Sequence, residues 1–483
     1  MATHGIGIEV TCADLPDVLA KVEGMSSRVT FSELTGGRGH NILSANPGPE
    51  LAVHGFVERE YAAAGTARRY GITSSGDCTE IESATFTTRV LVRRPAADAN
   101  FNGHVVVEWF NVSSGTDAAP EYTYLAPELI RSGYAWVGVS AQYTGIEGGA
   151  GSVGMDNDSP PQSLAAKYPE RYGALRHPGD GYSYDLFGAV GAALADPTAE
   201  GNPLAGLTVR RLIAAGESQS AMALTTYANY FANQHGVFDG ILIHSRPLGA
   251  LPLGDADAPA DITAAYRGQP VHICADISVP VFVVQTETDV LTNFQYVQAR
   301  QPDSPRLRVW EVAGTAHADH YQIGEYESLL GCPAPVNRGQ QRFVLRSALH
   351  HLRGWVDEQS EPPTATRLRV TDSGTGQRFE LDAVGNARDG VRTPCVDVPT
   401  QVLSGVVNDD VPRICVLFGV TTPLAPTVIA DLYASEDEYR TRYAAATDAA
   451  IDAGFARPAD RAELLADART DLVAGAQSFR SSP

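Results

Sequence analysis

Short apolar runs alternate with stretches of helical periodicity along the middle of the chain. The runs are rich in Val, Ile and aromatic residues, as buried strands are. They lie at 105–110, 134–140, 207–215, 238–243, 281–285 and 307–312. Helical patterns separate several of them, at 126–131, 184–194 and 219–233. This alternation predicts an α/β fold with a mostly parallel central sheet flanked by helices.

The regions on either side of this core have different patterns. Alternating polar and apolar residues at 56–61 and 84–92 predict two antiparallel strands at a sheet edge. A helix is expected at 342–358, followed by a β-rich, glycine-punctuated excursion at 364–405 and a helical C-terminal part. In that part, Ser435 and Asp460 each precede a glutamate by three residues, which is capping-box spacing.

Two stretches do not fit the alternation of strands and helices. Residues 143–177 and 248–274 are rich in Gly, Pro and Asp. In a sheet of this kind such insertions lie beyond the carboxyl ends of the strands, where ligands bind. We therefore expect lid or pocket-wall insertions within a single elaborated domain that spans residues 1–483.

The strongest chemical signal is the segment Gly216-Glu217-Ser218-Gln219-Ser220, which lies between a predicted strand and a predicted helix. This is the setting of a nucleophile elbow, a strained turn that exposes a serine hydroxyl. Small residues two positions before and after the serine avoid collision in such a turn. Ser220 stands where glycine is more common and is still small. The segment predicts Ser218 as a nucleophile.

A serine nucleophile needs a histidine base and a carboxylate that orients it. After the strand at 281–285, Asp289 is the preferred acid and Glu287 the second candidate. After the strand at 307–312, small residues lead to His317, the predicted base, and His320 follows three residues later. The predicted order along the chain is therefore Ser218, Asp289, His317.

Acyl transfer also needs hydrogen-bond donors for the oxyanion. The backbone N–H of Gln219 is one candidate, at a helix N-terminus, and Asn111 or Val112 in the loop after an earlier strand is the other. A plain polar strand cap is the alternative for that loop. Trp109 and Phe110 are candidate substrate-binding residues that either line the acyl pocket or pack beneath the loop.

Four segments are distinctive: Glu108-Trp109-Phe110-Asn111-Val112, Arg171-Tyr172-Gly173 with His177-Pro178-Gly179-Asp180, the elbow, and Gly385-Asn386-Ala387 with Val391-Arg392-Thr393-Pro394. Together they resemble a bacterial family known as the alpha/beta hydrolase domain family, over roughly residues 51–468. The resemblance implies the α/β-hydrolase fold and a triad on Ser218, His317 and Asp289 or Glu287. It implies little about the substrate.

Composition and charge narrow the functional classes. A formal net charge of −21 disfavours binding to nucleic acid or to anionic membranes. The start of the chain has no basic segment followed by an apolar one, and no run of eighteen apolar residues occurs, so a cytoplasmic protein is expected. The six cysteines form no C-x-x-C pair, and most are expected to be reduced.

Signals for metals and cofactors are weak, and we expect neither. The glycines at 149–154 match a dinucleotide motif without the strand and helix that it requires. His317, Asp319 and His320 are too few for a metal site. The acidic residues at positions 255, 257 and 261 fit a solvated loop better than a calcium site.

These observations predict a serine hydrolase that cleaves carboxylic esters of small molecules through an acyl-enzyme. An acyltransferase with the same triad and a catalytically silent binding protein are the alternatives. A homo-oligomer is compatible with the sequence, which leaves the substrate and the oligomeric state open.

Overall fold

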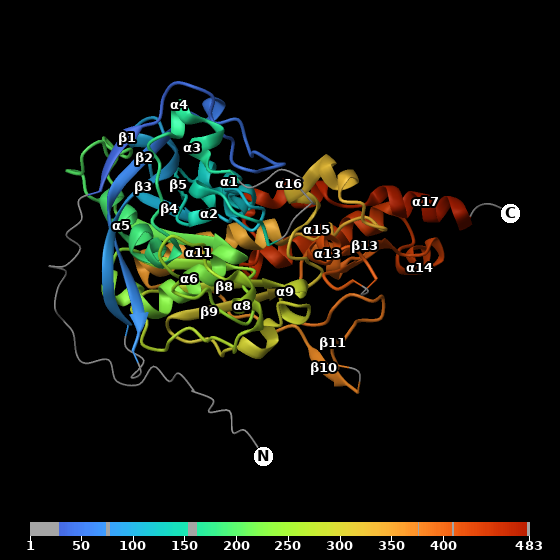
Figure 1. The fold of residues 1–483 in the computed structure, drawn as a ribbon. Coiled ribbons are helices and arrows are strands. Elements are labelled where there is room, and N and C mark those ends of the chain that lie inside the picture. Colours follow the sequence, from blue (N-terminus) through green and yellow to red (C-terminus); the bar gives the residue numbers. More distant parts are fainter. Residues whose placement is uncertain (1–28, 74–77, 153–161, 375, 408–409, 481–483) are drawn as a thin grey trace, which may run out of the picture.

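The computed structural model describes residues 29–73, 78–152, 162–374, 376–407 and 410–480. Within them, the central element is a nine-stranded sheet in the order β1-β2-β3-β5-β4-β6-β7-β8-β9 (Figure 1). Its strands are β1 (Thr30–Glu33), β2 (Phe56–Ile72), β3 (Cys78–Pro95), β4 (His104–Trp109), β5 (Ala135–Val139), β6 (Arg211–Glu217), β7 (Gly240–His244), β8 (Val281–Thr286) and β9 (Leu307–Val312).

Strands β4 to β9 are parallel, and β1, β2 and β3 add an antiparallel edge. Strands β4, β5, β7, β8 and β9 are buried along their whole length, as continuous apolar runs predict. The mostly parallel sheet expected from the sequence is therefore confirmed. Strand β6 begins at Arg211 and not at position 207, because its pairing with β4 starts where Arg211 faces His104.

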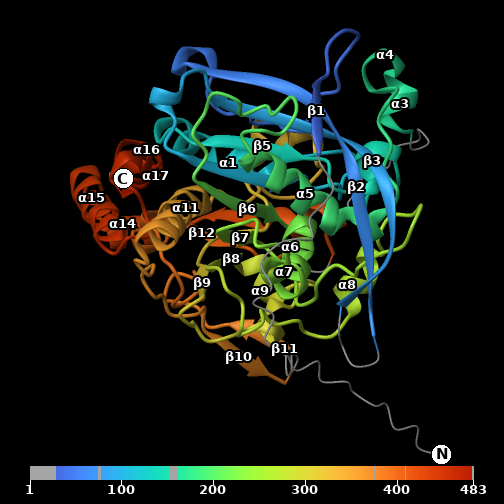
Figure 2. The same ribbon diagram turned by 90° about the vertical axis from the view of Figure 1, so that its left-hand side faces the viewer.

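Helices cover both faces of this sheet (Figure 2). Helices α1 (Pro120–Arg131) and α11 (Gln341–Glu358) pack on one face, where Val106 and Ile213 point. Helices α5 (Ser183–Ala195) and α6 (Gln219–Tyr230) pack on the other, where Val105 and Ala214 point. Neighbouring residues of one strand thus serve opposite cores, as the period of two along a strand requires.

The antiparallel pair β2 and β3 is longer than its two alternating sequence runs. Its strands hold 17 and 18 residues, yet only Val90 to Arg93 of β3 pair with β5. The rest of the hairpin therefore extends past the edge of the sheet, as Figure 2 shows.

The region after α11 combines small sheets with helices. The predicted excursion at 364–405 contains β10 (Val370–Ser373), β11 (Gly376–Phe379), α12 (Pro394–Asp397) and β12 (Gln401–Ser404). Next come α13 (Arg413–Phe418), β13 (Val420–Pro423), α14 (Pro426–Leu432), α15 (Glu436–Asp452), α16 (Arg461–Ala466) and α17 (Thr470–Arg480). The last four helices confirm the helical C-terminal part and lie away from the β2–β3 hairpin (Figure 1).

The two predicted capping boxes have different outcomes. The hydroxyl of Ser435 accepts from the Glu438 N–H at 3.1 Å and starts α15 as expected. The Asp460 side chain makes no cap and instead accepts hydrogen bonds from Arg131 and Arg346. Two guanidinium groups outcompete a backbone N–H, because charged hydrogen bonds are the stronger ones.

The cysteines differ from the expectation of mostly reduced thiols. Cys332 and Cys415, 83 residues apart, form a disulfide, and Cys274 is also disulfide-bonded. Cys78 and Cys395 are free, and Cys12 lies outside the described residues. The prediction was wrong because spacing along the chain carries no signal for pairs that only the fold brings together.

Candidate active site

Ser218 occupies the turn between β6 and α6. Its φ of 60° and ψ of −114° are unusual for a residue with a side chain and mark backbone strain. A Cβ on Gly216 would lie 2.8 Å from the Cβ of Ser220, so the turn requires glycine at position 216. The Ser218 N–H donates to the carbonyl of His244 at 2.9 Å and fixes the turn against β7. The local structure is that of the predicted elbow.

His317 and Asp289 come from the ends of two neighbouring strands and meet at Ser218. Nε2 of His317 lies 2.9 Å from the Ser218 Oγ, and its Nδ1 lies 2.7 Å from Asp289 Oδ1. His317 follows β9, in a loop that turns at Gly314 with a φ of 69°. Asp289 belongs to α9 (Glu287–Leu291), directly after β8. The structure therefore brings together the three residues predicted from the sequence.

Glu287, the second candidate acid, faces elsewhere. Its oxygens accept from the N–H groups of Gly314 at 2.6 Å and Gly405 at 2.9 Å. Burial raises the pKa of this carboxyl group to about 7. Glu287 therefore ties the His317 loop to the segment after β12.

His320, the alternative base, is also placed away from the nucleophile. Its Nδ1 lies 2.9 Å from Glu327 Oε2, and 42% of its side chain is exposed. It begins the short helix α10 (His320–Ile323), for which Asp319 is the N-cap. The geometry thus favours His317 over His320.

The predicted oxyanion donors are only partly accessible. The Gln219 N–H lies in the first turn of α6, where backbone donors have no partner within the helix. The Asn111 N–H donates to the carbonyl of Ala118 at 3.0 Å, and the Val112 N–H donates to Gln219 Oε1 at 3.1 Å. The loop after β4 therefore presents neither of its two predicted donors, because both already have partners within the protein.

Trp109 and Phe110 are completely buried, on opposite faces of the sheet. The Trp109 ring packs 4.9 Å from that of Phe187, and the Phe110 ring packs 6.0 Å from that of Trp136. This packing favours the structural alternative over a role in lining the acyl pocket.

Two aromatic residues that the sequence did not single out do reach the site. The side chain of Tyr266 in α8 (Ile262–Arg267) lies beside that of Ser218, and burial raises the pKa of Tyr266 to about 12. The Phe294 ring lies 4.4 Å from the His317 ring and 5.4 Å from that of Tyr266. Tyr266 belongs to the insertion at 248–274, so part of that insertion lies beside Ser218. In the sequence, the position of Tyr266 within this insertion is the signal that could have suggested its place at the site.

Several buried carboxyl groups lie close to the turn that holds Ser218. Burial, followed by neighbouring carboxylates, raises the pKa of Glu217 and of Glu108 well above the ordinary value. Glu121 lies 3.1 Å from Nδ1 of His244 and helps to raise the pKa of that histidine, in spite of its burial. The surroundings of Ser218 are therefore rich in buried carboxyl groups.

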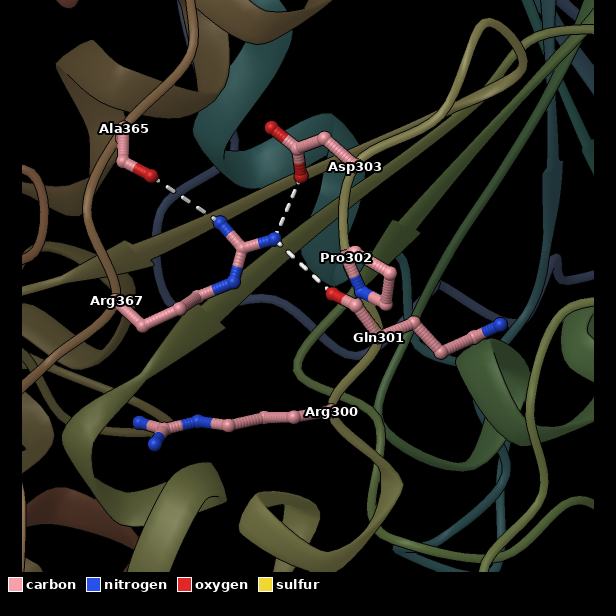
Figure 3. Close-up of a pocket in the computed structure, with 6 residues that line it drawn as sticks. All are labelled: Arg300, Gln301, Pro302, Asp303, Ala365 and Arg367. Atoms are coloured by element: carbon pink, nitrogen blue, oxygen red, sulfur yellow. Dashed lines mark hydrogen bonds and ion pairs between the residues drawn. The ribbon is translucent and has the colours of Figure 1, made fainter.

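The reacting groups are nearly closed off from solvent. Ser218 is 4% exposed and His317 is 5% exposed. A surface hollow lies elsewhere, and Ser218, His317 and Asp289 do not line it. Figure 3 shows its residues Arg300, Gln301, Pro302, Asp303, Ala365 and Arg367. Arg367 binds Asp303 at 2.6 Å, and Arg300 binds both oxygens of Glu311, so internal partners already engage both cations.

The described residues contain no group of three or more His, Cys, Asp or Glu side chains that could hold a metal ion. Asp261, considered above for calcium, caps α8 through the Ala264 N–H. The glycine motif at 149–154 falls partly outside the described residues. Across the part of the chain that the structure describes, no helix has both the length and the apolar character needed to cross a bilayer.

A mostly parallel sheet with an elbow serine and a histidine at the carboxyl ends of its strands defines the α/β-hydrolase fold. The chain belongs to the alpha/beta hydrolase domain family, whose model matches residues 28–466. The predicted fold and family are thereby confirmed.

Solved structures of other hydrolases are similar at low identity. A candidate dienelactone hydrolase from Klebsiella pneumoniae is 13% identical with a TM-score of 0.31, over 62% of this chain and 98% of that one. An esterase from Rhizomucor miehei is 14% identical with a TM-score of 0.32, over 63% and 85%. No protein with a curated description matches. Similarity at this level carries no information on the substrate.

Proposed function

We propose that the protein is a serine esterase that hydrolyses carboxylic esters of small molecules through an acyl-enzyme. The observation that carries the proposal is the continuous chain of contacts from Ser218 Oγ through both nitrogens of His317 to Asp289, at 2.9 and 2.7 Å. This arrangement lets the imidazole accept the serine proton while the carboxylate holds the ring and stabilises its charge.

The reaction follows from these contacts in two halves. In the first, Nε2 of His317 takes the Ser218 proton, Oγ bonds to the acyl carbon, and the same proton passes to the departing alcohol. In the second, His317 activates water, which attacks the acyl carbon and restores the Ser218 hydroxyl. The Gln219 N–H at the start of α6 is the backbone donor for the oxyanion, with the helix dipole in support.

The acidic surroundings of Ser218 support neutral substrates. Two carboxyl groups, of Asp289 and Glu217, approach His317 directly, and Glu121 and Glu108 lie behind them. An anionic acyl or alcohol group would lose its hydration in this nearly closed site, and the Asp289 carboxylate would repel it. We therefore propose uncharged esters as substrates.

Acyl transfer and silent binding are separated from hydrolysis by product analysis. The protein is incubated with p-nitrophenyl acetate, with and without a dilute alcohol acceptor, beside a Ser218→Ala variant. Free acetate as the main product in both cases, and none above background for Ser218→Ala, supports hydrolysis. Dominant transfer to the acceptor would replace hydrolysis by acyl transfer, and inactive but folded wild-type protein would indicate silent binding.

For location, we propose an oxidising compartment in place of the cytoplasm expected from the sequence. The Cys332–Cys415 disulfide supports this, because such bonds persist mainly outside reducing compartments. Alkylation of the native protein without reductant, followed by peptide mass spectrometry, tests the point. Alkylated Cys332 and Cys415 would contradict it.

A further inference from the structure

Two side chains share the reacting nitrogen of His317. Ser218 Oγ lies 2.9 Å from Nε2, and Glu217 Oε1 lies 3.2 Å from the same atom. Only 6% of the Glu217 side chain is exposed. Asp289 occupies the other ring nitrogen, so the imidazole touches two carboxyl groups and one hydroxyl.

Glu217 is held firmly in this position. Its backbone ends β6 and pairs with His244 of β7. The Asn111 Nδ2 donates both to the Glu217 carbonyl at 3.1 Å and to its Oε2 at 3.4 Å. Asn111, predicted as an oxyanion residue, thus fixes the glutamate that faces the base.

The neighbours of Glu217 determine its charge. Carboxyl groups face it from three elements: Glu121 of α1, Glu108 of β4 and Asp289 of α9. The side chains of Tyr124, Tyr266 and His317 also interact with Glu217. Burial and these three acids raise the pKa of Glu217 well above the ordinary value, which favours its protonated form.

We propose that Glu217 is a positioning residue that acts through His317 and works as a neutral acid, keeping Nε2 aligned between Ser218 and the leaving group. The inference rests on the proposed esterase function. Once Nε2 has taken the serine proton, the Glu217 oxygen is the nearby acceptor for the new N–H. That proton then passes to the alcohol oxygen of the ester, and Glu217 keeps its own proton throughout.

The charge of the Glu217 side chain affects how well His317 can act as a base. A second ionised carboxylate beside the imidazole would favour the imidazolium in the resting enzyme and would leave less free base near neutral pH. A neutral acid contributes a hydrogen bond without that charge. Asp289 is then the carboxylate that faces the other ring nitrogen.

Three substitutions at position 217 test the proposal with p-nitrophenyl acetate as substrate. Glu217→Gln keeps the shape and an oxygen acceptor, so kcat is expected to stay within about threefold of wild type. Glu217→Leu removes the oxygen acceptor, and the shorter side chain of Glu217→Asp moves that oxygen away from Nε2 of His317. Each of these two is expected to lower kcat by about 10- to 100-fold, with KM little changed.

The pH profile separates positioning from a structural role. For Glu217→Gln, the acid limb of kcat/KM is expected within about 0.3 units of wild type, because no charge is lost. If Glu217 were ionised, the limb would move to lower pH by about one unit or more. A shift of that size overturns the proposal.

A matched control is available in the pair of His320 and Glu327. Its 2.9 Å contact also joins a histidine to a glutamate, outside the triad. Glu327→Gln and Glu327→Leu are expected to keep wild-type kcat.

Wild-type kcat in all three Glu217 variants overturns the inference while the esterase function stands. If Glu217→Leu does not fold, the comparison of kcat between Glu217→Gln and Glu217→Asp still tests the inference. A wild-type protein without esterase activity overturns both the function and the inference.

Discussion

Asp289 Oδ1 lies 2.7 Å from Nδ1 of His317, and its other oxygen accepts from both the N–H and the hydroxyl of Thr286 at 2.7 Å. One carboxylate thus orients the base and caps α9 at the same time. Glu287, two residues earlier, points to Gly314 and Gly405 instead.

This difference predicts different effects for the two acids. Asp289→Asn is expected to lower kcat by about 10³- to 10⁴-fold, because the neutral amide neither stabilises the imidazolium nor favours the right tautomer. Glu287→Gln is expected to keep kcat within about tenfold in the folded fraction. Steady-state kinetics on both variants measure this, and the reverse order of the two losses would assign the acid to Glu287.

Glu287 also predicts a pH dependence of stability. Its pKa is about 7 in the folded protein against an ordinary 4.5, so between these values the folded protein holds a proton that the unfolded chain has released. Glu287 therefore makes the free energy of unfolding fall as pH rises from about 4.5 to 7, by roughly 3 kcal/mol in total.

Urea unfolding of wild type and Glu287→Gln at several pH values measures this contribution. The variant is expected to show a flatter loss of stability across the window, since the other buried acids are common to both proteins. Identical slopes would mean that Glu287 is ionised in the folded state.

Tyr266 predicts a moderate effect on catalysis. Its side chain lies beside that of Ser218, while the N–H groups of Asn111 and Val112 are engaged elsewhere. Tyr266→Phe is therefore expected to lower kcat by about 2- to 10-fold through loss of the hydroxyl group beside Ser218. Tyr326→Phe, at a ring that is 58% exposed, is the control. Equal kcat in both variants would mean that the Tyr266 hydroxyl does not contribute to catalysis and that only its ring contacts the site.

The Cys332–Cys415 disulfide predicts a local source of stability. It joins the loop before Asn337 to α13, and Ala318, next to His317, donates its N–H to the carbonyl of Leu417 in that helix. Replacing both cysteines with Ala is expected to lower the free energy of unfolding by about 2–4 kcal/mol. Cys78→Ala, at a free thiol, is the control in the same denaturant titration, and equal losses would contradict the prediction.

The sequence predicted the parallel sheet and the meeting of Ser218, Asp289 and His317 for a shared physical reason. Buried parallel strands appear as continuous apolar runs, and the residues just after them lie at one edge of the sheet. Ser218, Asp289 and His317 each follow such a run, so periodicity and chain order were enough to place them. This inference required no knowledge of the distances between the three residues.

The remaining features depend on contacts between distant segments. The Tyr266 contact comes from an insertion without periodicity, and Cys332 meets Cys415 across 83 residues. Asn111 was correctly placed after a strand, but its side chain binds Glu217 and its N–H binds Ala118. Which partner satisfies a polar loop residue is decided by packing, and a sequence pattern does not contain that information.

Covalent labelling of Ser218 tests the central claim most directly. Wild-type protein and Ser218→Ala are treated with a fluorophosphonate, and the intact mass and the modified peptide are determined by mass spectrometry. We predict one label per wild-type chain, on Ser218, and none on the variant. A folded wild-type protein that stays unlabelled, or that carries the label on another residue, would contradict the account.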